Sequence, residues 1–254
     1  MVIPNEFKKI AVVPVYNEER GITDVLADLV NIVDILIIVN DGSTDRSAMI
    51  IRNWQRKREN IYLIDSKKNR GMSWAVKRGF SFIYDNKDKL GIQDDDVVIQ
   101  IDADAQHLTN NINEMINYMK KNEIDYFVTC RVLRGYPFIK VMGNRLMSKL
   151  VSIVTSRYFN DVESGFRLLK AKVIPQLLFY TFGFRYSWAQ EMIVIASKIG
   201  LKVDNTWEIP IAYYRNRGTQ IYDAFVNSFF SCILLQVRFG FRDITKDKNY
   251  YRNF

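Results

Sequence analysis

Short apolar runs alternate with longer helix-like stretches along the first two thirds of this 254-residue chain. Five runs rich in β-branched residues have the character of strands: Ile10–Tyr16, Ile35–Asn40, Ile61–Asp65, Val97–Ile101 and Asp125–Arg131. The stretches between them have the length of helices: Gly21–Val33, Thr44–Arg58, Met72–Asn86 and Thr109–Lys121. Because nearly continuous apolar strands alternate with helices, the pattern predicts an α/β fold with a mostly parallel central sheet flanked by helices.

The second half of the chain is less regular. The elements expected there are helices over Val141–Ser156 and Trp188–Ile199, a turn at Glu163-Ser164-Gly165 and an extended stretch from Pro210 to Tyr214. In the first half, Ser43 or Asp41 is expected to cap the helix that follows the second strand. A chain of this length fits one large domain, or one domain with an appendage.

Polar residues follow each predicted strand. Ligands of an open α/β sheet bind beyond the carboxyl ends of its strands, so these residues are the first candidates for a site. They are Asn17-Glu18-Glu19, Asp41-Gly42-Ser43-Thr44-Asp45, Asn69-Arg70-Gly71, the stretch from Asp102 to His107, and Arg131. Four acidic or amide clusters and one Arg therefore converge on one edge of the sheet, which predicts a binding site.

The stretch Asp102-Ala103-Asp104-Ala105-Gln106 carries oxygen ligands at alternate positions as a buried strand ends. Alternation would send these side chains to one side, where they could meet a hard cation such as Mg²⁺ or Mn²⁺. The alternative is a solvated acidic turn that caps the next helix. Asp41 also has two interpretations, a carboxylate that binds a base or ribose hydroxyl and a turn residue within an Asp-Gly-Ser sequence.

Several motifs occur together in a specific order. They are Val13-Pro14-Val15-Tyr16-Asn17-Glu18-Glu19, Val39-Asn40-Asp41-Gly42-Ser43-Thr44-Asp45, Asn69-Arg70-Gly71 and Asp102-Ala103-Asp104-Ala105-Gln106-His107. This set resembles glycosyltransferase family 2, whose members have the GT-A fold. Gly143-Asn144-Arg145, Ser164-Gly165-Phe166-Arg167 and Gln190-Glu191-Met192 further resemble the branch that contains the dolichyl-phosphate mannose and glucose synthases. The resemblance spans about residues 10 to 220.

The resemblance implies an enzyme with assigned positions. The residues expected to bind the nucleotide sugar are Pro14, Tyr16, Glu18, Asp41 and Asp102. Those expected to hold a divalent cation, Mg²⁺ or Mn²⁺, are Asp102, Asp104 and Gln106. Those expected to bind the acceptor phosphate are Arg131, Arg145, Ser148 and Arg167, and those expected to carry catalysis are Asp104, Arg131 and Arg145. In the stretch Arg215 to Gln220, Gln220 stands where family members often carry a Lys, so a cationic lid is not implied there.

The reaction implied is an inverting transfer of a hexose from GDP-mannose or UDP-glucose to a polyprenyl or dolichyl phosphate. A phosphate oxygen is already anionic at neutral pH, so it needs positioning by arginines rather than a general base. The alternative is a family 2 enzyme with a glycan or other hydroxyl acceptor, for which Asp161 or Glu191 would serve as the base. The single histidine, His107, is interpreted as a loop residue near the site rather than a catalytic one.

Charge, cysteine content and the first strand bear on which other classes of protein the chain could belong to. The net charge of +8 indicates an anionic partner, but the Lys and Arg residues are scattered and no nucleic-acid module is recognisable, so nucleic acid is not expected. The first strand lacks a glycine-rich turn, which disfavours a nicotinamide-binding dehydrogenase. Cys130 and Cys232 lie in apolar surroundings far apart, which favours buried thiols and a reducing compartment.

The segment from Ala224 to Val237 is apolar on one helical face, fourteen residues long and followed by the basic positions Arg238, Arg242, Lys246 and Lys248. This predicts a GT-A domain over residues 1–220, followed by an amphipathic helix and basic tail over 221–254 that lie on a membrane surface. The alternatives for the helix are closure of the core or a dimer seam. Without a signal peptide pattern or an eighteen-residue apolar run, the expected location is the cytoplasm, peripheral at the cytoplasmic face of a membrane.

Overall fold

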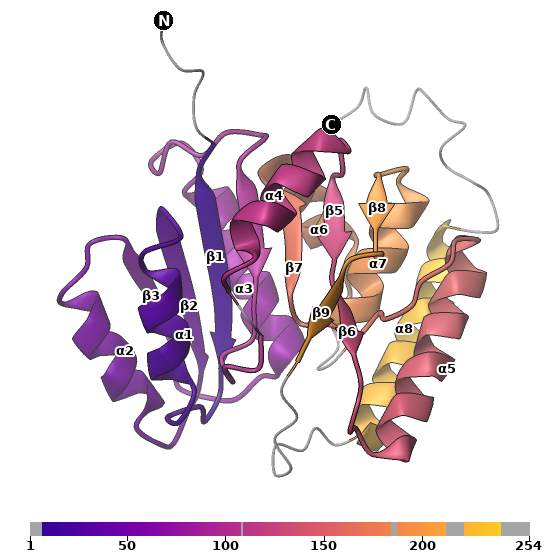
Figure 1. Ribbon diagram of the computed structural model, residues 1–254, viewed down its shortest axis with the longest axis horizontal. Helices are drawn as coiled ribbons and strands as arrows, with labels where there is room; N and C mark the ends of the chain where they lie inside the picture. Colours follow the sequence, from indigo (N-terminus) through magenta and orange to yellow (C-terminus); the bar gives the residue numbers. More distant parts are fainter. Residues whose placement is uncertain (1–6, 108, 184–186, 212–220, 240–254) are drawn as a thin grey trace, which may run out of the picture.

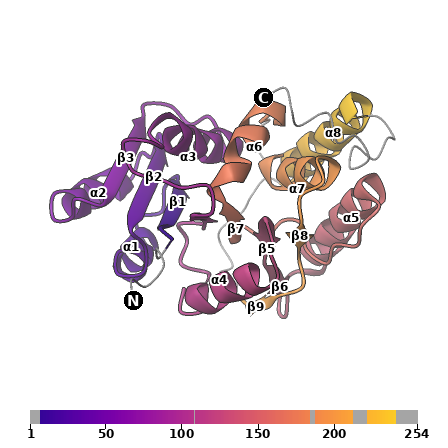
Figure 2. The ribbon, with the colours of Figure 1, turned by 90° about the horizontal axis from the view of Figure 1, so that it is seen from above.

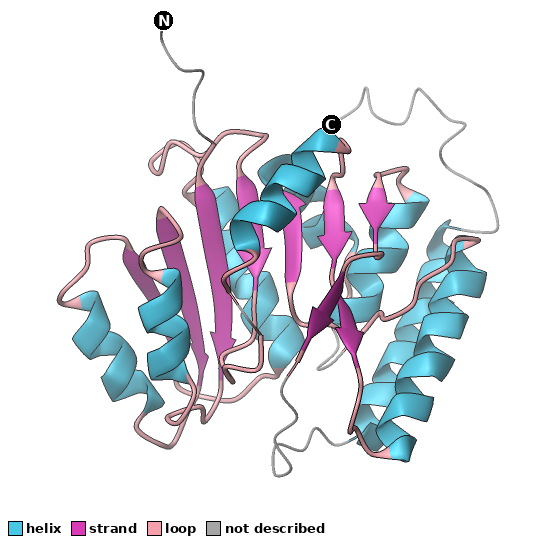
Figure 3. Cartoon of the chain, in the orientation of Figure 1, coloured by secondary structure: helices cyan, strands magenta, loops and turns pink. Residues whose placement is uncertain are grey.

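The computed structural model describes residues 7–107, 109–183, 187–211 and 221–239 of the chain, with side chains of 221–225, 227 and 228 left out. The principal sheet has seven strands in the order β3-β2-β1-β4-β7-β5-β8 (Figures 1 and 3). These strands are β1 (Lys9–Val15), β2 (Ile35–Asp41), β3 (Ile61–Ser66), β4 (Val97–Gln100), β5 (Tyr126–Val128), β7 (Arg167–Lys170) and β8 (Val203–Asp204). All neighbouring pairs are parallel except those of β7, so the predicted mostly parallel sheet is confirmed.

Helices cover both faces of this sheet (Figure 2). They are α1 (Ile22–Leu29), α2 (Ser47–Gln55), α3 (Met72–Asp85), α4 (Ile112–Lys121), α5 (Phe138–Thr155), α6 (Ile174–Tyr180), α7 (Trp188–Lys198) and α8 (Ile221–Phe239), with a short 3₁₀ turn, η1 (Ala171–Val173). Side chains alternate along β1, so Ile10 and Val12 pack in the core that contains α3 and α7, whereas Ala11 and Val13 pack in the core that contains α1 and α4. The strands are therefore apolar on both faces, as their sequences predict.

The strand predicted over Asp125–Arg131 is broken. β5 ends at Val128, and the chain continues as β6 (Cys130–Val132), which pairs in parallel with β9 (Glu208–Pro210) in a separate two-stranded sheet. Thr129 still follows the β5–β7 pairing, because its N–H and its hydroxyl both donate to the carbonyl of Phe166 at 3.2 and 2.8 Å. From Cys130 onward the chain pairs with β9 instead, and the N–H of Cys130 donates to the carbonyl of Trp207 at 2.8 Å, so Arg131 lies in β6 rather than at the end of a long strand.

β7 and α6 are among the elements that the sequence did not predict. β7 is a four-residue antiparallel strand inserted between β4 and β5, where Gln100 is opposite Arg167 and Ile99 is opposite Leu168. Its sequence begins and ends with a basic residue and has no strand-like length, so only its partners on either side make it a strand.

The C-terminal helix α8 is confirmed as a helix, and it packs against α5 and α7. Cys232, Leu235 and Phe239 belong to the core, whereas Phe229, Phe230, Ile233, Leu234 and Val237 are exposed. Closure of the core, one of the alternatives for this segment, therefore applies to its inner face. No helix in the described ranges combines the length and apolarity needed to cross a membrane.

Candidate active site

The loops after β1 and β2 are joined by hydrogen bonds. The backbone N–H of Asn17 donates to Ser43 Oγ at 3.0 Å, and that of Glu18 donates to Ser47 Oγ at 2.9 Å. In return, the N–H of Thr44 donates to Asn17 Oδ1 at 2.8 Å. The polar residues that follow β1 and β2 are thus joined to one another. Ser43 does not cap α2 as predicted, because its Oγ accepts the N–H of Asn17 and α2 begins only at Ser47.

Asp41 connects a third loop to this pair. Its carboxylate, which is almost fully buried, accepts the backbone N–H groups of Arg70 at 2.9 Å and Gly71 at 2.7 Å, at the start of α3. Asp41 therefore stabilises the beginning of α3 rather than that of α2, and its contact with a nucleoside stays a prediction. We call residues 17–19, 43–47, 41 and 70–71 the loop cluster.

The side chains near the loop cluster that are predicted to contact the nucleotide differ in their exposure. Pro14 is buried within β1 opposite Val39, whereas Tyr16 is 45% exposed and Glu18 is half-buried. Tyr16 is the side chain with a free face, as stacking on a nucleobase requires. The backbone of Glu18 is held on both sides, because its N–H donates to Ser47 Oγ of the loop cluster at 2.9 Å and its carbonyl accepts the N–H of Ile22, at the start of α1, also at 2.9 Å.

The stretch after β4 is a turn rather than a continuation of the strand. β4 ends at Gln100, Ala105 has a φ of 58°, and the N–H of Gln106 donates to Asp104 Oδ1 at 3.0 Å. Burial alternates from Ile101 to Asp104, but the backbone is not extended as far as Gln106, because a turn closed by the Asp104 side chain interrupts it. All three side chains are nevertheless half-buried in the same turn.

Gly165 packs directly on the Asp102 carboxylate. A Cβ atom at position 165 would overlap both carboxylate oxygens, so only glycine permits this approach. The Ser164-Gly165 turn precedes β7, and β7 lies beside β4, so the two motifs meet because their strands are neighbours. The sequence contains both motifs but gives no sign that they touch.

Asp102 is held as a carboxylate. Burial acts to raise its pKa, but His107 and the positive charges of Arg131 and Arg167 outweigh that effect, and its pKa is lowered. His107 is buried, with Nε2 3.9 Å from Asp102 Oδ2, which agrees with its interpretation as a residue near the site. Asp102 Oδ1 is buried, and no group of the described residues forms a hydrogen bond with it.

An ionised carboxylate oxygen that no N–H satisfies is a suitable ligand for a cation. The donor set of Asp102, Asp104 and Gln106 consists of oxygens from two carboxylates and an amide, which suits Mg²⁺ or Mn²⁺. Within the described ranges, no three His, Cys, Asp or Glu side chains are grouped as a metal site. The amide oxygen of Gln106, or a phosphate oxygen of a bound nucleotide sugar, would therefore have to complete the set of ligands.

Arg131 forms a buried ion pair with Asp161. Its Nε and Nη2 donate to the two oxygens of Asp161 at 2.7 and 3.0 Å, and its backbone N–H donates to the same carboxylate at 3.0 Å. The charge of Arg131 outweighs burial and lowers the pKa of Asp161, whereas burial raises the pKa of Glu163, which lies 4.0 Å from Arg131 Nη2. We call Arg131, Asp161 and Glu163 the arginine cluster.

Sequence reasoning missed the residue that positions Asp161. Asn205 accepts the backbone N–H groups of Asn160 and Asp161 through Oδ1, at 2.9 and 3.1 Å, and donates through Nδ2 to the carbonyls of Val128 and Asp161, both at 3.0 Å. It lies outside every motif, so no signal in the sequence singles it out.

The other predicted acceptor ligands are in three different environments. Arg145 is exposed on α5, and no described residue forms an ion pair with it. Ser148 is buried, and its Oγ accepts the N–H of Val162 at 3.3 Å. Arg167 is fully buried and donates to the carbonyls of Ser164, Val162 and Ala189 and to the hydroxyl of Tyr126, at 2.6 to 2.8 Å.

These contacts make Arg167 a structural residue, because its guanidinium is saturated by the core and does not reach solvent. We therefore do not carry Arg167 forward as an acceptor ligand, and the same burial argues against direct binding by Ser148. Glu191 is also buried. It accepts the hydroxyl of Ser187 and the backbone N–H groups of Phe182 and Gly183, and it forms no ion pair with any arginine among the described residues.

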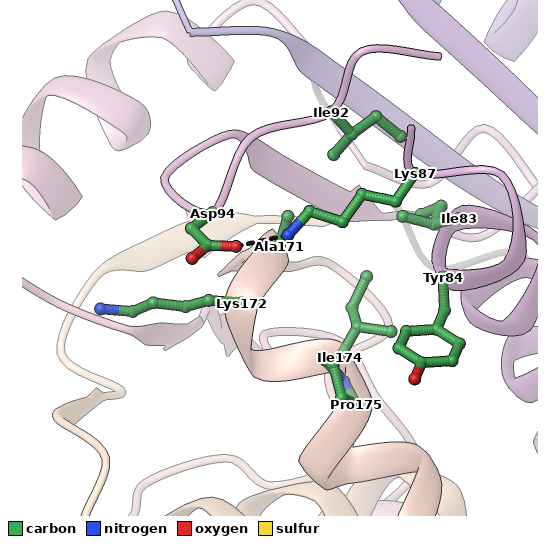
Figure 4. A pocket seen from close by; sticks show the side chains of 9 residues that line it. All are labelled: Ile83, Tyr84, Lys87, Ile92, Asp94, Ala171, Lys172, Ile174 and Pro175. Carbon is green, nitrogen blue, oxygen red and sulfur yellow. Dashed lines mark hydrogen bonds and ion pairs between the residues drawn. The ribbon is translucent and has the colours of Figure 1, made fainter. Parts of the chain in front are cut away.

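A surface pocket of about 160 Å³ lies away from these residues, between the end of α3 and the start of α6 (Figure 4). Its lysines are already paired, Lys87 with Asp94 and Lys172 with Asp125. The pocket lies at the opposite end of β4 from Asp102 and contributes nothing to the candidate site.

Comparison with known proteins identifies the family. The model of Glycosyl transferase family 2 matches residues 10–192. The chain belongs to this family. A UDP-N-acetylglucosamine–dolichyl-phosphate N-acetylglucosaminyltransferase of Methanococcus voltae is 27% identical over 249 residues, which cover 89% of this chain and 95% of the relative. A dolichyl-phosphate beta-glucosyltransferase of Trichomonas vaginalis is 23% identical over 231 residues, covering 83% and 67%.

Solved structures agree on the fold. Glucosyl-3-phosphoglycerate synthase from Mycobacterium tuberculosis, in complex with Mn²⁺, uridine-diphosphate-glucose and phosphoglyceric acid, has a TM-score of 0.66 to this chain at 16% sequence identity, covering 92% of this chain and 80% of that one. The predicted GT-A fold, glycosyltransferase activity and resemblance to the dolichyl-phosphate branch of family 2 are confirmed.

Proposed function

We propose that this glycosyltransferase moves a sugar, with inversion, from a nucleotide sugar to a polyprenyl or dolichyl phosphate in a divalent-cation-dependent reaction. The observation that carries the proposal is that Asp102 and Arg131 lie at the same end of the sheet, close enough for the charge of Arg131 to lower the pKa of Asp102. Asp102 offers a buried, unbonded carboxylate oxygen, while Arg131, whose charge lowers the pKa of Asp102, is fixed in place by Asp161. The Asp102 carboxylate suits a cation that binds the diphosphate of the nucleotide sugar, and the Arg131 guanidinium suits an anionic acceptor.

Asp102, Asp104 and Gln106 are the residues proposed to hold Mg²⁺ or Mn²⁺. A divalent cation there would neutralise the negative charge that develops on the departing nucleoside diphosphate. The Mycobacterium tuberculosis structure of similar fold contains Mn²⁺ with its nucleotide sugar, which supports the choice of ion to test.

The acceptor step follows from charge. A phosphate oxygen of the lipid forms a bond to the anomeric carbon, the bond from that carbon to the donor's diphosphate oxygen breaks, and the electron pair leaves with the nucleoside diphosphate. Arg131 is proposed to bind the acceptor phosphate, and the exposed Arg145 is proposed to attract it. No proton has to be removed, because the attacking oxygen is already anionic.

The alternative of a hydroxyl acceptor loses support from the same contacts. The two carboxylates that could serve as its base, Asp161 and Glu191, are buried and bonded to other groups. The lowered pKa of Asp161 makes it a weak base as well. Glu163 is the remaining carboxylate near Arg131, and burial raises its pKa.

The sugar and base are left to experiment. GDP-mannose and UDP-glucose were the predicted donors, and the Methanococcus voltae relative adds UDP-N-acetylglucosamine to the set. The deciding experiment supplies the full chain with Mn²⁺, each radiolabelled nucleotide sugar in turn and a short polyprenyl phosphate. We expect label in the organic phase with one donor, and no label after addition of EDTA. Release of free sugar without lipid product would instead favour the hydroxyl-acceptor alternative.

We further propose that the enzyme works at a membrane surface, because a polyprenyl acceptor resides in a bilayer. The exposed apolar residues of α8 support the predicted interfacial helix. The predicted division of the chain at residue 220 and the cytoplasmic location stay predictions.

A further inference from the structure

The two carboxyl groups of the arginine cluster differ in how they are bonded. Asp161 accepts four N–H groups at 2.7 to 3.0 Å, three from Arg131 and the backbone N–H of Glu163. A carboxylate has about four acceptor positions, so Asp161 has none left for a ligand. The carboxyl of Glu163 accepts no hydrogen bond from a described residue, because its Oε2 lies 4.0 Å from Arg131 Nη2, and its side chain is 35% exposed. Glu163 is therefore the carboxyl of this cluster that can meet a ligand.

The charges of the arginine cluster do not suit an anionic ligand if both carboxyl groups are ionised. Asp161 is ionised, because the charge of Arg131 outweighs burial and lowers its pKa. An ionised Glu163 would then give the cluster two negative charges and one positive charge. The proposed function brings a phosphate dianion to Arg131, and like charges at such short range repel each other. A proton on Glu163 removes this conflict and supplies an O–H donor.

The groups around Glu163 favour its protonated form. Burial and the negative charge of Asp161 raise its pKa, and together they outweigh the positive charges of Arg131 on β6 and Arg167 on β7. Arg167 cannot turn towards a ligand, because its guanidinium donates to three backbone carbonyls and to the hydroxyl of Tyr126. A bound phosphate adds another negative charge beside Glu163, which favours the protonated carboxyl still further. A dianion and a proton should therefore bind together.

We propose that Glu163 takes up a proton from solvent when the acceptor phosphate binds, and that its O–H then donates to a phosphate oxygen other than the one that attacks the sugar. This inference rests on the proposed function, which places the acceptor phosphate at Arg131. The attacking oxygen stays anionic, so the transfer itself still removes no proton. The product is a phosphodiester with one negative charge fewer than the acceptor, so it favours the protonated carboxyl less. The proton therefore returns to solvent as the product leaves.

The test is isothermal titration calorimetry of the full chain with farnesyl phosphate, a short polyprenyl phosphate, at about pH 7. Repeating the titration in two buffers with different enthalpies of ionisation gives the number of protons taken up per bound phosphate. A phosphate monoester has a second pKa of about 6, so the ligand's own change of protonation contributes to wild type and variants alike. We expect wild type to take up about half a proton more than Glu163→Gln.

The affinities should depend on pH in the same way. A glutamine side chain is neutral at every pH and can donate an N–H to phosphate, so Glu163→Gln should bind as tightly as wild type at about pH 6. At about pH 8 it should bind about tenfold more tightly, because wild type alone must take up the proton. Glu163→Ala, which lacks the donor, should also lose the pH dependence but bind more weakly than Glu163→Gln.

Glu208→Gln is the matched control. Glu208 lies on β9, which pairs with the strand that contains Arg131, but it is exposed. Its replacement should leave proton uptake as in wild type. Circular dichroism and thermal unfolding of each variant separate a change in binding from a loss of folding.

Equal proton uptake by wild type and Glu163→Gln would overturn the inference and leave the acceptor site standing. Tighter binding by Glu163→Gln at every pH, without a difference in uptake, would mean that Glu163 stays ionised and only repels the phosphate, which also overturns it. Loss of the uptake in Glu208→Gln as well would overturn its assignment to Glu163. If farnesyl phosphate bound to neither wild type nor any variant, the acceptor of the proposed function would be wrong, and the inference would fall with it.

Discussion

The loop cluster and the arginine cluster lie at the same end of the sheet but are held by different forces. Apart from the buried Asp41, Ser47 and Gly71, the loop cluster consists of half-buried and exposed residues, and backbone-to-side-chain hydrogen bonds join it, such as those from Asn17 and Glu18 to Ser43 and Ser47. The arginine cluster depends on one buried ion pair between Arg131 and Asp161. Several modest bonds tolerate the loss of one member, whereas a buried charge does not tolerate the loss of its partner. The following predictions test this contrast, from the largest effect to the smallest.

Asp102 follows β4 at the end of the sheet where both clusters lie, and it carries the proposed cation ligand, so its removal should have the largest effect. Asp102→Asn keeps the shape of the side chain but removes the charge of the unbonded oxygen, and we expect the transfer rate to fall by about a thousand-fold or more. The measurement is the initial rate at saturating Mn²⁺, with thermal unfolding as the control for folding. A variant that retains most of its rate would remove Asp102 from the proposed cation site.

Asp161→Asn should cause the largest loss of stability. It leaves the guanidinium of Arg131, whose side chain is only 16% exposed, without its counter-charge, and we expect the free energy of unfolding to fall by about 3–5 kcal/mol. Denaturant unfolding measures this change, and Glu163→Gln is the matched control because Glu163 lies at 4.0 Å from the same Arg131. Similar stability losses in both variants would contradict the special role of the buried pair.

The same pair predicts a dependence on pH. The pKa of Asp161 is lower in the folded chain than in the unfolded chain, where a typical Asp has a pKa of about 3.9. The stabilisation is therefore complete above that value and is lost as the pH falls through the lowered folded pKa. The difference in unfolding free energy between wild type and Asp161→Asn should be constant at neutral pH and shrink only in acid. A difference that already shrinks near neutrality would contradict the lowered pKa.

Arg145→Ala should weaken acceptor use without changing the fold. Arg145 is exposed and forms no ion pair with a described residue, so its loss leaves no buried group unsatisfied. We expect KM for polyprenyl phosphate to rise about tenfold, equivalent to about 1.4 kcal/mol, with little change in KM for the donor. An unchanged acceptor KM would restrict phosphate binding to the arginine cluster.

Ser43→Ala should have the smallest effect. It removes the acceptor for the N–H of Asn17, which is exposed and can bond to water instead, so the free energy of unfolding should fall by only about 1 kcal/mol. KM for the nucleotide sugar should rise slightly, and acceptor KM should stay the same. A decrease in the free energy of unfolding as large as that of Asp161→Asn would show that the loop cluster, like the arginine cluster, depends on a single interaction.

The parts that the sequence predicted well are those whose signals are local. The apolar runs around Val12, Ile37 and Val98 are buried on both faces, so period and composition were enough to identify the strands. The order of strands and helices then placed the loop cluster and the turn at Asp102 at one edge. The long-range contacts had no such signal. The predicted strand over Asp125–Arg131 is divided because its last residues pair with β9 instead of β7, and β7 exists because β4 and β5 pair with it on either side.

Single residues changed roles for the same reason. Arg167 belongs to a motif that suggested an exposed ligand, yet the core supplies four hydrogen-bond acceptors and buries it. The sequence alone determined the α/β alternation, the family and the chemical types at the candidate site, because periodicity and contiguous motifs are properties of neighbouring residues. Only the tertiary structure decided that Gly165 rests on Asp102, that Asp161 holds Arg131 and that α5 packs against α8. Those contacts join residues far apart in the chain, and their energies exist only after the sheet has brought them together.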